Sequence, residues 1–209
     1  MRTRRLGLFG GTFDPPHVGH LVLAGWALEA LGLERVLFVP AGQPPHKPGR
    51  RISPARHRLA MTRLAVRGNP RFGVSTLEIA RPGPSFTVET LRRLARRHDG
   101  ELHLLIGADS LDEFRLWHEP EAILGLARLA VAGRPGAGRR ATLTWARRSP
   151  RVTWIGNPGV EVSSSLVRRR VGTGHSCRYL VPESVWRYIE RHRLYLRSAR
   201  PPGPASRRG

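Results

Sequence analysis

The sequence predicts an α/β protein with a doubly wound parallel sheet and a small helical part at its C-terminal end. Short apolar runs typical of buried strands alternate with longer segments whose apolar residues recur at helical spacing. The chain has 209 residues, of which 40% are hydrophobic, enough for one sizeable core. We therefore expect a single domain over residues 1–196 and a disordered tail over 197–209.

The individual elements follow from apolar periodicity and from the residues that begin and end helices. The first helix ends where Gly32 suits the C′ position, and the second opens with Ser53 as N-cap and Pro54 at its first position. Loops are expected at 41–53 and 134–140. Strands are expected at 4–10, 35–40, 72–76, 101–107, 127–133 and 151–156, and helices at 17–32, 53–68, 85–98, 109–117, 120–126, 141–149, 163–174 and 182–196.

A sheet of this kind binds ligands at the carboxyl ends of its strands, near the point where the strand order reverses. Three segments are expected to meet there: the glycine turn after the first strand, the Gly107–Ser110 stretch, and the serines near residue 163.

The formal net charge of +21 is compatible with a basic nucleic-acid-binding protein that has no catalytic function. Lys47 is the one lysine, however, so the charge comes from arginines spread along the whole chain. That distribution favours a general compositional bias over a designed patch. The sequence also lacks an interleaved aromatic and basic pattern, so we expect no specific nucleic-acid partner.

Cysteine content and hydropathy place the chain among cytoplasmic proteins. Cys177 is the sole cysteine, which rules out a disulfide framework and a cysteine-based zinc site. The apolar stretch near the N-terminus is too short for a signal peptide, and no run reaches the roughly 18 apolar residues of a membrane span.

The stretch "GLFGGTFDPPHVGH" at 7–20 predicts an anion site. Gly10 and Gly11 let a ligand approach the backbone N–H groups, and the helix that follows points its positive end at the same place. His17 and His20 lie three residues apart on one face of that helix. They lack the further ligands that zinc needs, so the alternatives are phosphate donors or merely capping histidines.

The stretch "VSSSLVR" at 162–168 offers a second set of phosphate-binding groups. Ser163 and Ser165 stand at a helix start, and Arg168 follows one turn later. Two hydroxyls and a guanidinium on one turn suit a polyphosphate, although an ordinary N-cap with a solvated arginine would look the same.

These two stretches resemble the nucleotidylyltransferase superfamily of the HxGH type, which has a Rossmann-like fold. Within it, "PAGQPPHK" (40–47), "SFTVETL" (85–91), "LIGADSLDEFRLWHEP" (105–120) and "VPESVWRYI" (182–189) resemble the bacterial nicotinate-nucleotide adenylyltransferases. The resemblance runs from about Leu6 to Tyr195. The chain departs from the usual motif in having Ser165 where the family has threonine, which keeps the hydroxyl.

The resemblance implies transfer of the adenylyl group of ATP to nicotinic acid mononucleotide, a step of NAD biosynthesis that releases pyrophosphate. Nicotinamide mononucleotide or phosphopantetheine as acceptor is the alternative. Mg²⁺ would bind to the ATP phosphates, without dedicated protein ligands. The resemblance is also compatible with a homo-oligomer. The implied catalytic residues are His17, His20 and Arg168; the ATP-binding ones are Gly10, Gly11, Thr12, Phe13, Lys47, Gly107, Asp109, Ser163 and Ser165; and the nicotinate-nucleotide-binding ones are Thr87, Trp117 and His118.

Overall fold

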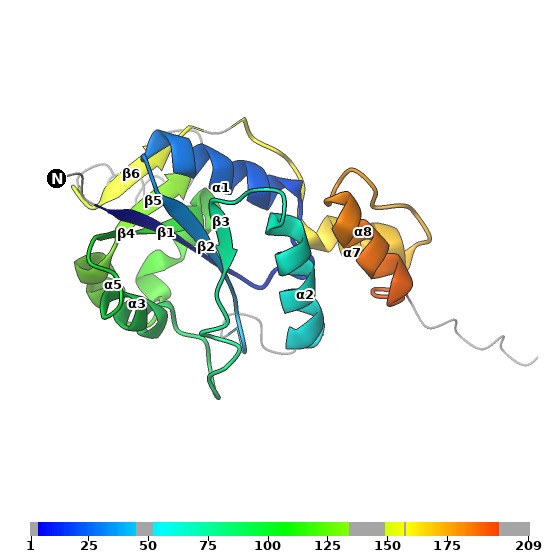
Figure 1. Cartoon of the computed structure of the whole chain (residues 1–209), viewed down its shortest axis with the longest axis horizontal. Coiled ribbons are helices and arrows are strands. Elements are labelled where there is room, and N and C mark those ends of the chain that lie inside the picture. Colours follow the sequence, from blue (N-terminus) through cyan, green and yellow to red (C-terminus); the bar gives the residue numbers. More distant parts are fainter. Residues whose placement is uncertain (1–3, 45–51, 134–148, 157, 197–209) are drawn as a thin grey trace, which may run out of the picture.

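The computed structural model describes residues 4–44, 52–133, 149–156 and 158–196 (Figure 1). Six parallel strands form one sheet in the order β3-β2-β1-β4-β5-β6, which confirms the predicted fold class. The strand order reverses between β1 and β4, so the ligand crevice of a doubly wound sheet belongs between these two strands. The strands are β1 (Arg5–Gly11), β2 (Arg35–Pro40), β3 (Phe72–Val74), β4 (Glu101–Gly107), β5 (Arg128–Ala132) and β6 (Val152–Ile155).

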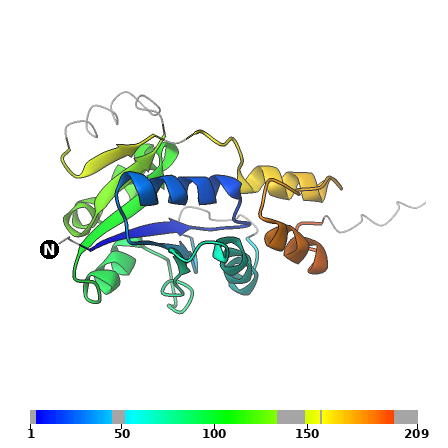
Figure 2. The same cartoon turned by 45° about the horizontal axis from the view of Figure 1, so that its top comes forward.

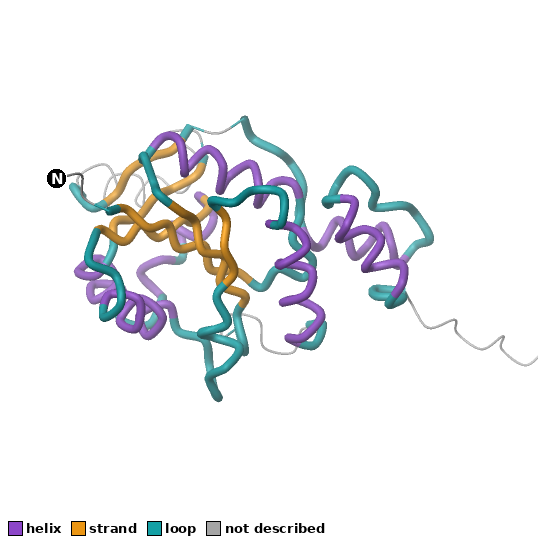
Figure 3. The backbone as a smooth tube through the Cα atoms, viewed as in Figure 1, coloured by secondary structure: helices purple, strands orange, loops and turns teal. Residues whose placement is uncertain are grey.

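Helices cover both faces of the sheet, and alternate residues of the strands face opposite layers (Figures 1 and 3). Leu8 of β1 packs in the core under α3 and α5, whereas its neighbour Phe9 packs in the core under α1. The helices are α1 (Val18–Ala30), α2 (Ala55–Val66), α3 (Thr87–Ala95), α4 (Ala108–Asp112), α5 (Pro120–Leu126), α7 (Ser164–Gly172) and α8 (Glu183–Arg191), with a 3₁₀ turn η1 (Phe114–Leu116).

The first helix ends as the sequence predicts. Gly32 has a φ of +58°, its N–H donates to Glu29 O, and the N–H of Leu33 donates to Leu28 O. This pair of bonds is the Schellman motif, which requires the left-handed conformation that glycine adopts without strain.

The start of α2 corrects the prediction for Ser53. The helix begins at Ala55 with Pro54 at the N-cap position, and no side chain caps it. Ser53 lies one residue too early, and its backbone N–H donates to the Asp14 carboxylate at 3.0 Å. Ser53 therefore makes a tertiary contact instead of the helix cap that the local sequence pattern predicts.

The C-terminal helical part packs beside α2 around a third core of its own (Figure 2). This core contains Met61 and Ala65 of α2, Val167 of α7, and Val185 and Ile189 of α8. The predicted helix at 182–196 is shorter in the structure, because α8 ends at Arg191 and Arg193 adopts a φ of +49°. The chain then turns back toward the sheet.

The remaining predictions differ from the structure by a few residues, or fall outside the part it describes. The predicted helix at 109–117 divides into α4 and η1, and α3 begins at Thr87. The loop at 134–140, the helix at 141–149 (except Ser149) and the tail at 197–209 lie outside the described residues. None of the described helices is long and apolar enough to cross a membrane.

Candidate active site

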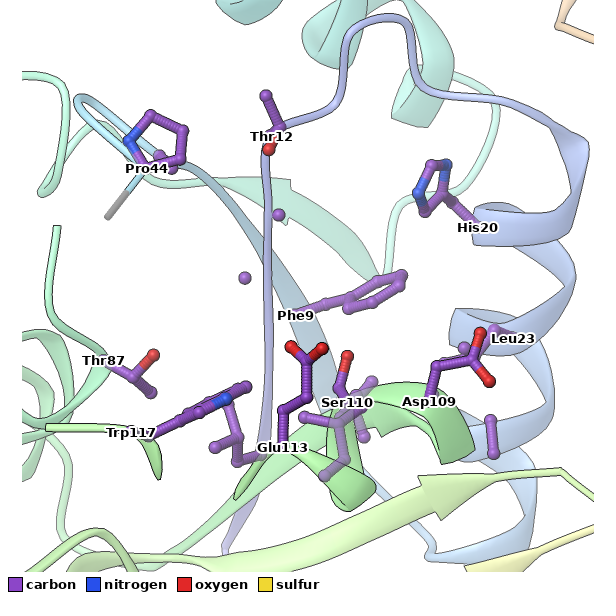
Figure 4. A pocket seen from close by; sticks show the side chains of 18 of the residues that line it. Phe9, Thr12, His20, Leu23, Pro44, Thr87, Asp109, Ser110, Glu113 and Trp117 are labelled. Carbon is purple, nitrogen blue, oxygen red and sulfur yellow. The ribbon is translucent and has the colours of Figure 1, made fainter. Parts of the chain in front are cut away.

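A pocket of about 700 Å³ opens at the carboxyl ends of the central strands, at the predicted crevice. In Figure 4, Thr87 and Trp117 lie at one end, Leu23 and Asp109 lie at the other, and Thr12 and His20 lie beyond Phe9. Ten of the predicted site residues line it, namely Gly10, Gly11, Thr12, His17, His20, Thr87, Gly107, Asp109, Trp117 and His118.

The two glycines of the turn differ in what surrounds them. A Cβ placed on Gly10 would have no protein atom within 4 Å, because this position faces the open pocket. A Cβ on Gly11 would lie 2.9 Å from the Phe13 ring. Gly11 is thus required by packing within the turn. At Gly10 the space beside the backbone belongs to the pocket and is open to a ligand.

Phe13 lies beneath the turn with its side chain in the core. It is 2% exposed, has a φ of +49°, and its ring packs edge-on against Phe9 at 5.6 Å between ring centroids. Its ring also contacts Phe38 and His20. The side chain predicted to contact ATP therefore supports the turn and His20 from below, so only its backbone could meet a ligand.

The paired histidines begin α1 in a capping arrangement. The backbone N–H of His17 donates to Nδ1 of His20 at 3.1 Å, and the two rings lie 3.7 Å apart between centroids. Because Nδ1 of His20 accepts this bond, a neutral His20 ring carries its proton on Nε2. His20 thus has a fixed ring orientation, and its side chain lines the pocket (Figure 4).

His17 is buried and neutral near pH 7. It is 7% exposed, and burial lowers its pKa to about 4. Its Nδ1 has no hydrogen-bond partner among the described residues. Gly19 leaves space for the ring, since a Cβ there would lie 3.1 Å from that Nδ1. The glycine of the H-x-G-H pattern therefore allows His17 to fold back over its own helix.

The α7 segment reaches the same turn from the other end of the chain. Ser163 caps α7 by accepting the N–H of Leu166 at 3.1 Å, so its hydroxyl has a local role. Arg168 donates from Nη1 to Asp14 O at 2.7 Å and from Nη2 to Ser165 Oγ at 3.1 Å. Ser164 donates to Pro15 O at 2.8 Å, a contact that the sequence pattern did not single out. Arg168 and Ser164 therefore contact segment 14–15, and all four of these α7-segment residues lie outside the pocket lining.

The wall of the pocket that contains Thr12 and Ala41 is held by a buried arginine that sequence reasoning missed. Arg58 of α2 is 2% exposed and donates to the carbonyls of Thr12, Ala41, Gly42 and Ser53. Four carbonyls from three separate segments converge on one guanidinium. A single arginine in a helical pattern gives no sequence signal for such a role.

The opposite side of this wall is held by Ser85, just before α3. Its Oγ accepts the N–H groups of Gly42 at 2.9 Å and Gln43 at 3.2 Å. The buried carboxylate of Glu78 bonds to Ser85 and to Thr90 Oγ1, and burial raises the pKa of Glu78. The loop after β2 is therefore fixed through its carbonyls by Arg58 and through its N–H groups by Ser85.

The end of the pocket near Trp117 is aromatic and polar. His118 stacks on Phe86 at 4.3 Å between ring centroids, and Thr87 is the first residue of α3. Glu113, which the sequence pattern did not indicate, directs its carboxylate into the pocket (Figure 4). Lys47 lies outside the described residues. Within the described ranges, no cluster of three or more histidine, cysteine, aspartate or glutamate residues could hold a metal ion.

Comparison with known proteins gives one consistent family. Residues 8–170 match the family model described as "Cytidylyltransferase-like". The chain is 50% identical over 195 residues to a protein of Thermomicrobium roseum named "Probable nicotinate-nucleotide adenylyltransferase", with 91% of each chain covered. A Thermus thermophilus protein of the same name is 47% identical over 91% of this chain and 99% of its own.

The fold also matches solved structures. The Plasmodium falciparum nicotinic acid mononucleotide adenylyltransferase complexed with NaAD superimposes with a TM-score of 0.75 at 16% identity, over 92% of this chain and 97% of that one. At 16% identity this similarity shows a shared fold and nothing further.

Proposed function

The chain belongs to the nicotinate-nucleotide adenylyltransferases, and we propose that its pocket holds ATP and nicotinic acid mononucleotide end to end across the glycine turn. Its activity is the transfer of the adenylyl group of ATP to this mononucleotide, which gives nicotinic acid adenine dinucleotide and pyrophosphate in NAD biosynthesis. The observation that carries the proposal is the open space over Gly10, in a pocket that His20 also lines. Arg168 lies outside the pocket lining and binds the Asp14 carbonyl of the same turn.

The adenosine of ATP would lie at the Asp109 end, where a carboxylate can accept from ribose hydroxyls or the adenine amino group. Its phosphates would pass over Gly10 and Gly11 toward the start of α1, whose positive end favours anions. Ser165 and Arg168 would hold the β- and γ-phosphates. Ser163 would contribute chiefly by capping α7, because its Oγ already accepts a backbone N–H.

In the reaction, an oxygen of the mononucleotide phosphate attacks the α-phosphorus of ATP in line. A new P–O bond forms, the bond from the α-phosphorus to the bridging oxygen breaks, and that electron pair leaves with pyrophosphate. The nucleophile is already an anion, so no general base is required. The protein acts by positioning and by stabilising the charge that develops on the phosphate oxygens.

Two histidines would donate hydrogen bonds where this charge develops. His20 would donate from Nε2 to an α-phosphate oxygen, with its ring held by the N–H of His17. His17 would donate a second hydrogen bond. Since burial lowers the pKa of His17 to about 4, its ring enters the complex neutral, and an adjacent polyphosphate would raise that pKa.

Mg²⁺ would enter with the triphosphate and neutralise part of its charge. Histidine, serine and arginine donors suit phosphate oxygens, whereas Mg²⁺ prefers carboxylates and water. The donors around the glycine turn fit a nucleotide that brings its own hydrated metal ion. Lys47 would add a further positive charge to the same phosphates.

The pyridine ring would lie at the other end of the pocket. Trp117 offers a flat face for stacking, and the Thr87 hydroxyl or a backbone N–H at the start of α3 would bind the ring carboxylate. His118, stacked on Phe86, would line the same subsite.

The direct test is pyrophosphate release from ATP and Mg²⁺ with each acceptor in turn. We expect the fastest release with nicotinic acid mononucleotide. Faster release with nicotinamide mononucleotide or phosphopantetheine would overturn the assigned acceptor. No release with any acceptor, together with tight binding to single-stranded nucleic acid, would instead favour the non-catalytic alternative.

A further inference from the structure

Asp14 is a buried carboxylate immediately after the glycine turn. It is 3% exposed, and both of its carboxylate oxygens are bonded within the protein. Oδ1 accepts the hydroxyl of Tyr195 at 2.7 Å, and Oδ2 accepts the backbone N–H of Ser53 at 3.0 Å. A buried carboxylate with two short bonds has one orientation, because losing either bond would leave an unpaired charge in the interior.

The backbone of the same residue receives Arg168. Its carbonyl accepts Nη1 of Arg168 at 2.7 Å, while Nη2 of that guanidinium donates to Ser165. The position of Arg168 relative to the glycine turn is thus set by the orientation of the Asp14 peptide. Three distant parts of the chain, around Ser53, Arg168 and Tyr195, meet on one residue of the phosphate-binding turn.

Tyr195 reaches this place because the chain reverses after α8. Arg193 and Tyr195 both adopt left-handed backbone conformations, with φ of +49° and +65°. Such conformations are unfavourable for residues with side chains and persist where surrounding contacts hold them. The Asp14 carboxylate, and the contact of Tyr195 Oη with Met61 Sδ at 3.8 Å, supply those contacts.

We propose that Tyr195 is a positioning residue for catalysis: its hydroxyl fixes Asp14, and Asp14 fixes Arg168 at the triphosphate. This inference rests on the proposed role of Arg168 in holding the β- and γ-phosphates. It assigns the C-terminal segment a part in the reaction although Tyr195 lies outside the pocket lining. Partners that orient metal-binding side chains contribute about 10- to 100-fold to metal affinity or activity, and we take the same scale for a partner that orients a phosphate-binding arginine.

The test compares two tyrosine hydroxyls of the same helical part. Tyr195→Phe removes the bond to Asp14, whereas Tyr188→Phe removes the 3.0 Å bond to Nδ1 of His57, which involves no residue of the turn. We expect Tyr195→Phe to lower kcat/KM for ATP by about 10-fold or more. The KM for the mononucleotide should change little. Tyr188→Phe should leave both parameters within about two-fold.

A double-mutant cycle separates positioning from a general structural role. In an Arg168→Ala background, Tyr195→Phe should cause no further loss, because the residue it positions is already gone. Equal fold-losses in the two backgrounds would refute the proposal, as would a Tyr195→Phe enzyme that behaves like Tyr188→Phe. Thermal unfolding of each variant checks that the assays compare folded proteins.

Hydrogen exchange of the unaltered protein provides a test that needs no variant. If the contact favours ATP binding, ATP must stabilise the contact by the same free energy. Backbone amides at 192–196 should therefore exchange more slowly with ATP and Mg²⁺ than without them, and unchanged exchange would overturn the proposal. A wild-type protein that binds ATP but releases no pyrophosphate with any acceptor would contradict the proposed function, and this outcome is separate from the exchange result.

Discussion

Substitution of Gly10 by alanine separates ligand binding from folding more cleanly than any other change in the turn. The added methyl group would project into the pocket with no protein atom within 4 Å. The fold should tolerate it, and alanine in place of glycine in a strand should stabilise the protein by about 0.5–1 kcal/mol.

The same methyl group would occupy the space through which we propose the ATP phosphates pass. An extra methylene-sized group in a close-packed contact costs roughly 1–3 kcal/mol. Since about 1.4 kcal/mol corresponds to a factor of ten, the KM for ATP should rise roughly 5- to 140-fold. Steady-state pyrophosphate release at varied ATP concentrations measures this rise, and thermal unfolding measures the stability.

Two further glycines serve as controls. A Cβ on Gly25 of α1 also has no neighbour within 4 Å but lies outside the pocket, so Gly25→Ala should leave the KM unchanged. A Cβ on Gly11 would lie 2.9 Å from Phe13, so Gly11→Ala should lower the stability as well as the activity. A normal KM for ATP in a folded Gly10→Ala enzyme would refute the placement of the phosphates over this turn.

The other predictions concern the donors, the pocket wall and the pyridine subsite. His20→Ala should lower kcat by about 100-fold or more, which is the scale for loss of one hydrogen-bond donor to the transition state. An unchanged kcat would show that His20 serves only to cap α1. Because burial lowers the pKa of His17 from 6.5 to about 4, His17 contributes stability that is complete above pH 6.5 and is lost as the pH falls toward 4. The loss should reach at most about 3 kcal/mol, and His17→Gln should flatten the dependence of Tm on pH in that window. Arg58→Met should lower the free energy of unfolding, measured by urea titration, by about 3 kcal/mol or more, since several buried carbonyls lose their donor. Arg63→Met, on the exposed side of the same helix, should change this free energy little. Trp117→Ala should raise the KM for nicotinic acid mononucleotide about 10-fold while the KM for ATP stays within about two-fold, and equal changes in both would argue against a stacking role.

The sequence predicts the local structure around the glycine turn correctly, because the residues that form it are neighbours in the chain. The glycine turn, His17 and His20 lie within eleven positions of one another, so their spacing alone predicts that they share one helix start. The order of apolar runs likewise predicts the sheet, because buried parallel strands and amphipathic helices have different periods.

The sequence does not predict the role of a residue that acts through contacts distant in sequence. Arg58 binds the Thr12 carbonyl 46 residues away, and nothing in its helix distinguishes it from an exposed arginine. Ser53 precedes a helix, and only the folded chain shows that its N–H serves Asp14. Phe13 belongs to the recognisable motif, yet its side chain supports the turn from the core.

The spacing of these contacts along the chain also bears on how the protein is made. Ser164 bonds to Pro15 across 149 residues, and Tyr195 bonds to Asp14 across 181. During synthesis the first strand and the paired histidines therefore emerge well before the groups that complete their surroundings. Contacts of such separation form late and slowly. A nascent chain therefore carries an incompletely supported glycine turn until Tyr195 has been translated.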